Sequence, residues 1–105
     1  MKNNNIKTKI INIKEIRQYA RALHCPTRWE IIGVLADKNL STGEISEALR
    51  EKGMEVEAQN LYYHLSELGA VGIIGVSSYR EVGGGAPEKV WELKVRKLTI
   101  NLIKE

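Results

Sequence analysis

The chain has 105 residues, of which 43% are hydrophobic and 28% are charged, so it can build one small globular domain around a single core. No apolar run is long enough to cross a membrane, and the polar residues 1–5 lack the apolar segment of a secretory signal, so we expect a cytoplasmic protein. One cysteine, Cys25, excludes an internal disulfide framework and a multi-cysteine metal site.

Charge is distributed unevenly along the chain. Sixteen Lys and Arg against thirteen Asp and Glu give a net charge of +3, which permits a nucleic-acid partner without requiring one. Residues 1–35 carry a net +5, residues 36–70 a net −4 and residues 71–105 a net +2. The two ends are therefore basic and the middle is acidic.

The first predicted helix follows a polar start, residues 1–8, which we expect to be flexible. Asn12 and Glu15 have the spacing of a helix N-cap and its return partner. The helical repeat predicts a helix over residues 13–24, with a buried stripe of Ile13, Ile16, Ala20 and Leu23. Its other face is basic, with Lys14, Arg17 and Arg21.

A second helix is predicted over residues 26–36. Pro26 suits its first position, where a missing N–H is no loss. Its expected buried positions are Trp29, Ile32, Gly33, Leu35 and Ala36. Residues 37–40 are predicted to form a turn.

Two more helices complete the predicted helical part. Ser41 and Glu44 have capping-box spacing and start a helix over residues 42–52, and Gly53 suits the positive φ that follows a helix. The fourth helix, over residues 57–68, has a buried stripe of Ala58, Leu61, Leu65 and Leu68. Its outward residues are Gln59, Asn60, Tyr63, Ser66 and Glu67.

After residue 69 the pattern changes to that of strands. Residues 71–82 are rich in β-branched side chains, residues 83–87 form a Gly-rich loop, and residues 89–95 alternate between apolar and polar, so a β-hairpin is predicted. The tail, residues 96–105, fits either a strand or a helix.

The order of helices and hairpin predicts a single α+β domain over residues 1–105. It is that of a winged helix-turn-helix, with a helical core, a hairpin wing at about 79–90 and an extra N-terminal helix. The residues expected to be buried together are Trp29, Ile32, Leu35, Ile45, Leu49, Leu61, Leu65, Leu68 and Trp91.

Three stretches resemble ArsR-like transcriptional regulators. Residues 22–53 contain Ala-Leu-x-x-Pro-Thr-Arg followed by a Ser-x-x-Glu-Ile opening of the next helix. Residues 61–74 contain His-Leu-x-x-Leu before a Gly, as in the recognition helix of that family, and residues 83–93 are similar to its wing tip. The resemblance implies a winged-helix regulator that binds double-stranded DNA as a homodimer.

The chain departs from this family in two respects. The family often has Asp where Cys25 stands, and its metal-sensing members carry paired cysteines on a helix, so thiolate metal sensing is not expected and no cofactor or metal is predicted. Residues 53–69 contain no Lys or Arg, although phosphate attraction dominates DNA affinity.

The candidate DNA-contacting residues fall into two groups. Base reading is assigned to the predicted recognition helix, residues 57–68, because Gln and Asn pair bidentately with adenine, and the candidates are Gln59, Asn60, Tyr62 and Tyr63. Candidates for phosphate contact are Ser41, Thr42, Arg28, Arg80 and Lys89, together with the basic face of the first helix. Capping is the simpler role for Ser41 and Thr42, an intramolecular partner for Arg28, and packing for His64.

Other functions stay open on the sequence. The first alternative is a winged-helix module that binds a protein through its acidic middle segment, and a weaker one is RNA binding through the basic ends. One cysteine and two histidines do not supply a catalytic constellation, so we do not expect an enzyme. A homodimer seam is expected to use apolar residues of both ends, namely Ile6, Ile10, Ile13, Leu98, Leu102 and Ile103.

Overall fold

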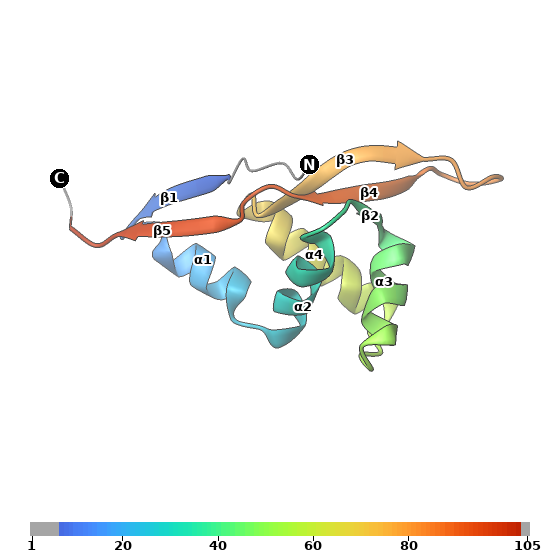
Figure 1. Ribbon diagram of the computed structural model, residues 1–105, viewed down its shortest axis with the longest axis horizontal. Coiled ribbons are helices and arrows are strands. Elements are labelled where there is room, and N and C mark those ends of the chain that lie inside the picture. The colour runs from blue at the N-terminus through green and yellow to red at the C-terminus, as the bar shows by residue number, and fades with distance from the viewer. Residues whose placement is uncertain (1–6, 104–105) are drawn as a thin grey trace.

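A computed structural model describes residues 7–103 of the chain (Figure 1). Within that range the chain forms four helices and five strands in an elongated body of 53 × 33 × 26 Å. The elements in chain order are β1 (Thr8–Asn12), α1 (Ile16–Leu23), α2 (Pro26–Leu35), β2 (Leu40–Ser41), α3 (Thr42–Glu51), α4 (Ala58–Ala70), β3 (Ile74–Arg80), β4 (Glu88–Leu93) and β5 (Lys97–Asn101). The predicted α+β class is confirmed.

The wing is a three-stranded antiparallel sheet in the order β2-β4-β3. The predicted hairpin forms between β3 and β4, with an irregularity between Val76 and Ser78. The predicted turn over residues 37–40 is wrong at its end, because Leu40 is buried and pairs with Trp91 as part of β2. This short strand ties the start of α3 to the wing.

The two ends of the described chain pair with each other. β1 and β5 form a separate two-stranded parallel sheet in which Ile11 lies opposite Ile100 (Figure 1). The sequence of the tail fits either a strand or a helix, and the structure shows that it forms a strand over Lys97–Asn101. The expected flexibility of residues 1–8 is wrong for Thr8, which begins β1, and residues 1–6 lie outside the described residues.

The helices form the core that the sequence predicts, with one exception. Leu65 and Leu68 on α4 are fully enclosed, and Trp91 from the wing closes the core from above. The other predicted members that are buried are Leu35, Ile45, Leu49 and Leu61. Ile32 is half-buried against this core, and Ala58, predicted to belong to the α4 stripe, is exposed in the first turn.

The exception is Trp29, which is 65% exposed. Helix α2 buries Arg28 and Ile31, which were not predicted to be buried, together with the predicted Leu35. Apolar residues of α2 lie on all sides of the helix, so the sequence periodicity does not determine which face turns inward. Contacts of the Arg28 guanidinium with neighbouring helices accompany the observed rotation, as described below.

Helix α1 is also rotated relative to the prediction. It buries Tyr19 and Ala22, whereas Ala20 is exposed and Ile13 lies before the helix, also exposed. The Tyr19 hydroxyl donates a hydrogen bond of 2.9 Å to the carbonyl of Val71. An amphipathic tyrosine with this partner is favourably buried, and its position determines the rotation of α1.

The predicted helix ends are confirmed where local chemistry sets them. Ser41 and Glu44 form a complete capping box at α3, and Pro26 opens α2. Gly53 has a φ of +85°, the left-handed conformation expected just past a helix. Cys25 makes no side-chain capping bond, as its weak acceptor predicts.

We predict that Leu65→Ala lowers the free energy of unfolding by about 2–5 kcal/mol, because Leu65 is fully enclosed and truncation leaves a cavity. Urea unfolding followed by circular dichroism measures the change. Val82→Ala, at an exposed position of the wing, is the control and should change the value by less than about 0.5 kcal/mol. Equal effects of the two substitutions would contradict the described packing of α4.

Candidate nucleic-acid interface

Helix α4 presents a row of polar and aromatic side chains to solvent. Leu61, Leu65 and Leu68 fix one face of α4 against the core. The rest of the helix surface there is exposed and carries the four predicted base-reading residues, with Gln59 and Tyr63 opposite the leucines and Asn60 and Tyr62 on the two flanks. The helix therefore brings these four together on one accessible surface.

Arg28 lies beneath this row and contacts both α1 and α4. It is 5% exposed, and its guanidinium donates to the carbonyls of Arg21 at 3.2 Å and Ala22 at 3.1 Å. Its Nε donates to Nδ1 of His64 at 3.0 Å, and the guanidinium carbon lies 5.2 Å from the centre of the Tyr63 ring. Its assignment as a phosphate contact is wrong, because the group is enclosed by these partners.

His64 joins α4 to this buried arginine. The Arg28 bond needs an unprotonated Nδ1 as acceptor. Burial, and to a smaller extent the charge of Arg28, lower the pKa of His64 from its usual value of 6.5. Because its ring also packs beside Tyr63, His64 has the packing role that the sequence favoured.

The N-terminus of α3 is occupied by groups of the chain itself. The Ser41 hydroxyl accepts from the Glu44 N–H, and the Thr42 hydroxyl accepts from the Trp91 indole at 2.9 Å. Both side chains are buried, so their assignment as phosphate contacts is wrong: Ser41 has the simpler capping role, whereas Thr42 binds the wing instead. The Gly43 N–H donates to a carboxylate oxygen of Glu88 at 2.8 Å, a contact that no local sequence pattern signals.

The two basic residues of the wing are accessible but already have partners. Arg80 lies 3.0 Å from a carboxylate oxygen of Glu44, and both side chains are half exposed. A backbone hydrogen bond from Ser41, followed by the bond from Arg80, lowers the pKa of the Glu44 carboxyl. Lys89 lies with its Nζ 5.6 Å from the centre of the Trp91 ring. A phosphate must compete with these contacts.

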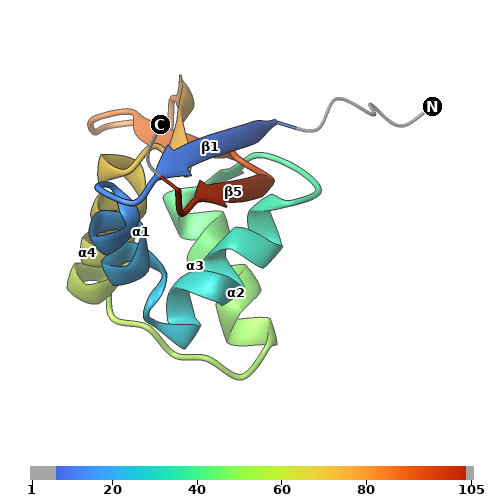
Figure 2. The same ribbon diagram turned by 90° about the vertical axis from the view of Figure 1, so that its left-hand side faces the viewer.

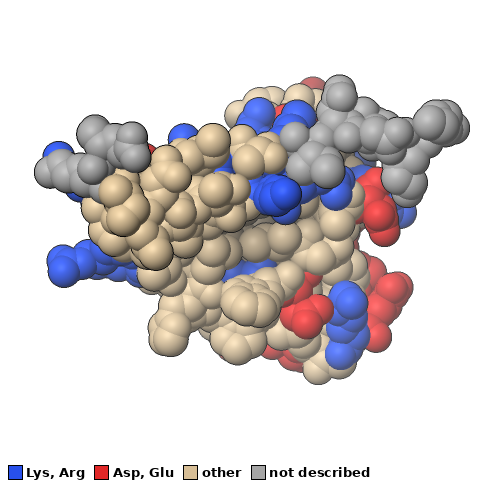
Figure 3. Space-filling view, turned by 60° about the vertical axis from the view of Figure 1, so that its left-hand side comes forward, with Lys and Arg blue, Asp and Glu red and all other residues tan. Residues whose placement is uncertain are grey.

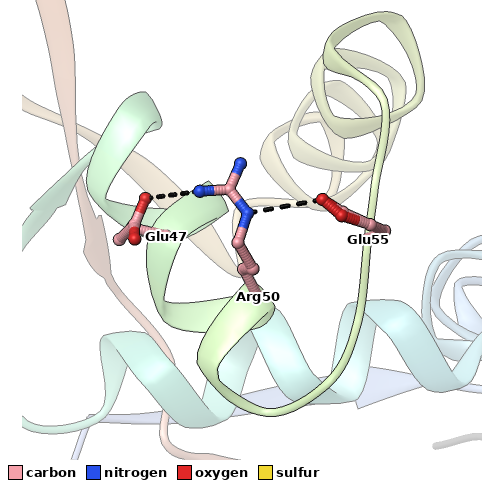
Figure 4. A network of polar contacts seen from close by, with 3 residues as sticks. All are labelled: Glu47, Arg50 and Glu55. Carbon is pink, nitrogen blue, oxygen red and sulfur yellow. Dashed lines mark hydrogen bonds and ion pairs between the residues drawn. The ribbon is translucent and has the colours of Figure 1, made fainter.

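Acidic side chains pair with the cations at the end of α3. Arg50 lies between Glu47 at 2.8 Å and Glu55 at 3.3 Å, in a network that spans α3 and the loop before α4 (Figure 4). Lys52 pairs with Glu30 of α2 at 3.6 Å. These surface pairs contribute little stability, but they neutralise the positive charge closest to the start of α4.

A basic face remains on α1. Helix α1 packs beside α4 (Figure 2). Lys14, Arg17 and Arg21 are exposed on α1 or just before it. The predicted basic face of the first helix is thus accessible, although of its predicted apolar stripe only Ile16 and Leu23 are half-buried, while Ile13 and Ala20 are exposed.

Within residues 7–103, no group of three or more His, Cys, Asp and Glu side chains is placed to hold a metal ion. No helix in the same range has the length and apolar character needed to cross a membrane.

Solved structures with the same arrangement are winged-helix transcription regulators. A PadR-like transcription factor from Bacteroides fragilis matches with a TM-score of 0.59 and 20% identity, over 75% of this chain and 74% of that chain. Reduced HlyU from Vibrio cholerae matches with a TM-score of 0.57 and 24% identity, over 76% and 73%. PadR from Bacillus subtilis, in complex with operator DNA, matches with a TM-score of 0.55 and 22% identity, over 63% of this chain and 38% of that chain.

These likenesses define the class of the fold: the chain is a winged-helix protein of the kind found in transcription regulators. No model of a protein family matches the sequence, and no curated protein matches it.

The contact between Arg28 and His64 predicts a pH dependence of stability. The pKa of His64 is lowered in the folded state, so the unfolded chain takes up this proton first as the pH falls. Its contribution to stability is therefore present above about pH 6.5 and is lost as the pH falls below that value. Urea unfolding at about pH 8 and about pH 5.5 measures the loss.

Two variants separate this contribution from the carboxylates that titrate in the same direction. His64→Asn keeps an acceptor without the titration and should lose less stability on acidification than the wild type. His24→Asn, at an exposed position, is the matched control and should lose as much as the wild type. The assignment is wrong if His64→Asn and the wild type respond identically.

Proposed function

We propose that this protein is a sequence-specific, DNA-binding transcriptional regulator of the cytoplasm that reads double-stranded DNA with α4. The observation that carries the proposal is the uncovered row of Gln59, Asn60, Tyr62 and Tyr63 on the second helix of a helix-turn-helix, beside a hairpin wing. The likeness to PadR, whose structure contains operator DNA, supports it. The role is binding, without catalysis.

The proposed base contacts follow from side-chain chemistry. A helix of this kind enters the major groove, where Gln59 and Asn60 can each form two hydrogen bonds with adenine. Tyr62 and Tyr63, each more than half exposed, can reach a phosphate or a thymine methyl. Glu67 is partly exposed on the same helix and opposes the phosphates.

The proposed phosphate contacts lie outside α4. Arg80 and Lys89 supply them from the wing, and the basic face of α1 supplies Lys14, Arg17 and Arg21. Arg28, Ser41 and Thr42 hold the framework instead. Because Arg80 exchanges Glu44 for a phosphate, its net gain is smaller than that of a free arginine, and we expect modest affinity with a small salt dependence.

We further propose that the regulator is ArsR-like. The residues that support this are Pro26-Thr27-Arg28 at the start of α2, His64-Leu65 in α4 and Gly85-Ala86-Pro87 at the wing tip. Two of them, Arg28 and His64, contact each other. The absence of a second cysteine from the sequence keeps thiolate metal sensing out of the proposal.

The proposed regulator is a homodimer. Its seam uses apolar residues that a monomer leaves exposed at the ends of the chain, namely Ile10, Ile13, Leu102 and Ile103. Leu98 contributes less, because it already packs against the core, and Ile6 lies outside the described residues. Sedimentation velocity at micromolar concentration should give the mass of two chains. A single-chain mass would remove the homodimer from the proposal.

A second candidate is a winged-helix module that binds a protein partner through the acidic segment from α3 to α4. The observation that favours it is that Arg50 and Lys52, the two cations at the end of α3, are paired with carboxylates. Neither is therefore free to attract a phosphate toward α4. A protein with this acidic surface should elute early from a heparin column, whereas a protein with a DNA-binding surface should be retained on it.

Base and phosphate contacts make different predictions. Gln59→Ala should weaken binding to the preferred site by about 1–3 kcal/mol more than binding to random DNA, because it removes a bidentate contact. Arg80→Ala should weaken binding to all sequences similarly and reduce the salt slope by about one. Fluorescence anisotropy at several salt concentrations measures both.

Matched controls exist for both substitutions. Gln18→Ala, exposed on α1, removes the same side chain and should leave sequence preference unchanged. Arg50→Ala removes the same charge from the acidic network and should leave the salt slope unchanged. If Gln59→Ala and Tyr63→Ala spare DNA binding but abolish binding to a protein partner, α4 is a protein-docking surface and the second candidate is correct.

A further inference from the structure

The sheet formed by β1 and β5 is structurally incomplete. It has two strands and lies at the opposite end of the molecule from the wing (Figure 1). A two-stranded sheet needs further strands or packing against a helix to be stable, and here Ile11 and Leu98 pack against the core while the outer edges have no strand beside them among the described residues. Each strand has one neighbour within the described chain, so each has an open edge.

The open edge of β5 has free backbone groups. The Lys97 N–H points toward β1, where it donates to the carbonyl of Lys7 at 3.2 Å. Successive residues of a strand direct their backbone groups to opposite sides. Leu98 and Ile100 therefore direct their N–H and C=O groups away from β1, to the open edge.

This edge has few of the features that normally prevent strand pairing. Residues 97–101 contain no proline, no glycine and one charge, at Lys97. Apolar side chains continue along and past the strand, with Ile100 41%, Leu102 65% and Ile103 74% exposed. Figure 3 shows the surface over this end of the molecule largely without charged side chains. A patch of this kind marks an interface.

We propose that β5 pairs antiparallel with β5 of a second copy of this chain, centred on Thr99, to give a continuous four-stranded sheet β1-β5-β5-β1. The inference rests on the homodimer proposed above and names its interface. A two-fold axis through Thr99 aligns the whole of both strands, which span Lys97–Asn101. Each exposed edge then supplies the hydrogen-bonding partners that the other lacks.

The sequence of β5 is complementary to itself in this register. Leu98 lies opposite Ile100 of the second copy, so apolar side chains meet on one face. Lys97 lies opposite Asn101, which keeps the two lysines at opposite ends of the pair. Like charges directly opposite each other would destabilise the sheet, and this register avoids them.

The edge of β1 is a poorer candidate for the same role. Its apolar residue on the core side, Ile11, is 1% exposed and already packed. Of its other residues, Ile10 is exposed among polar neighbours in Thr8, Lys9 and Asn12. The unsatisfied apolar surface is thus greater along β5 and its continuation.

The test is a symmetric disulfide. Because the backbone groups of Thr99 face β1, the two Thr99 residues form a non-hydrogen-bonded pair with Cα atoms about 4.5 Å apart, within the range for a disulfide. In a Cys25→Ser background, mild oxidation should convert the Thr99→Cys variant into a disulfide-linked species with the mass of two chains. Thr8→Cys, the same change on β1 of the same sheet, is the matched control and should remain a single chain.

A second pair of variants tests the edge without oxidation. Ile100→Pro removes an N–H from the open edge of β5, where proline is tolerated in an isolated edge strand, and sedimentation should shift from two chains to one. Thr8→Pro makes the equivalent change at the open edge of β1, at a residue outside the proposed seam, and should leave two chains. Circular dichroism checks that both variants fold.

The outcomes separate this interface from the proposed function. Crosslinking of Thr8→Cys without Thr99→Cys, or dissociation by Thr8→Pro alone, overturns the pairing through β5, as does a single-chain mass for the wild type. A crosslinked Thr99→Cys dimer upholds the interface even if it binds no DNA in the anisotropy experiment, in which case the function as a DNA-binding regulator is wrong.

Discussion

The buried guanidinium of Arg28 is the contact on which the orientation of the helices depends. It joins the last turn of α1, through two carbonyls, to His64 of α4 and lies against Tyr63. A positive charge at a helix C-terminus is favourable, because it meets the negative end of the helix dipole. The arginine therefore fixes α1 and α4 around α2, and with them the direction in which the polar face of α4 points.

The wing is joined to the helices by a second set of polar contacts. The Trp91 indole donates to the Thr42 hydroxyl, Glu88 accepts from Gly43, and Arg80 pairs with Glu44. All three contacts converge on the first turn of α3, whose N–H groups need acceptors. This packing positions the wing relative to α4, and it uses side chains that would otherwise be available to an anionic partner.

The scarcity of free positive charge near α4 also affects the proposed function. Arg28 is buried beneath α4, and Arg50 and Lys52 are paired with carboxylates, so the remaining exposed cations beside α4 in the described chain are those on and just before α1, namely Lys14, Arg17 and Arg21. Phosphate attraction dominates the affinity of most DNA-binding proteins, so this chain is expected to depend more on base contacts and on a second copy. Two copies double the number of contacts, so the proposed interface through β5 and the proposed function of α4 support each other.

The sequence by itself determined the helices, their caps and the hairpin, because those depend on local chemistry: the capping box at Ser41, the proline at the start of α2 and the glycine after α3. It also identified the exposed polar row on α4, since the leucine repeat there leaves one choice of inner face. It did not determine the rotation of α2, where several faces are comparably apolar, and on α1 it placed the buried face at Ala20 instead of Tyr19 and Ala22. Tertiary partners far along the chain decided both rotations, namely Val71 for Tyr19 and His64 for Arg28. Pairing of the two ends as β1 and β5 was likewise decided only in the fold, because strand pairing depends on residues about ninety positions apart.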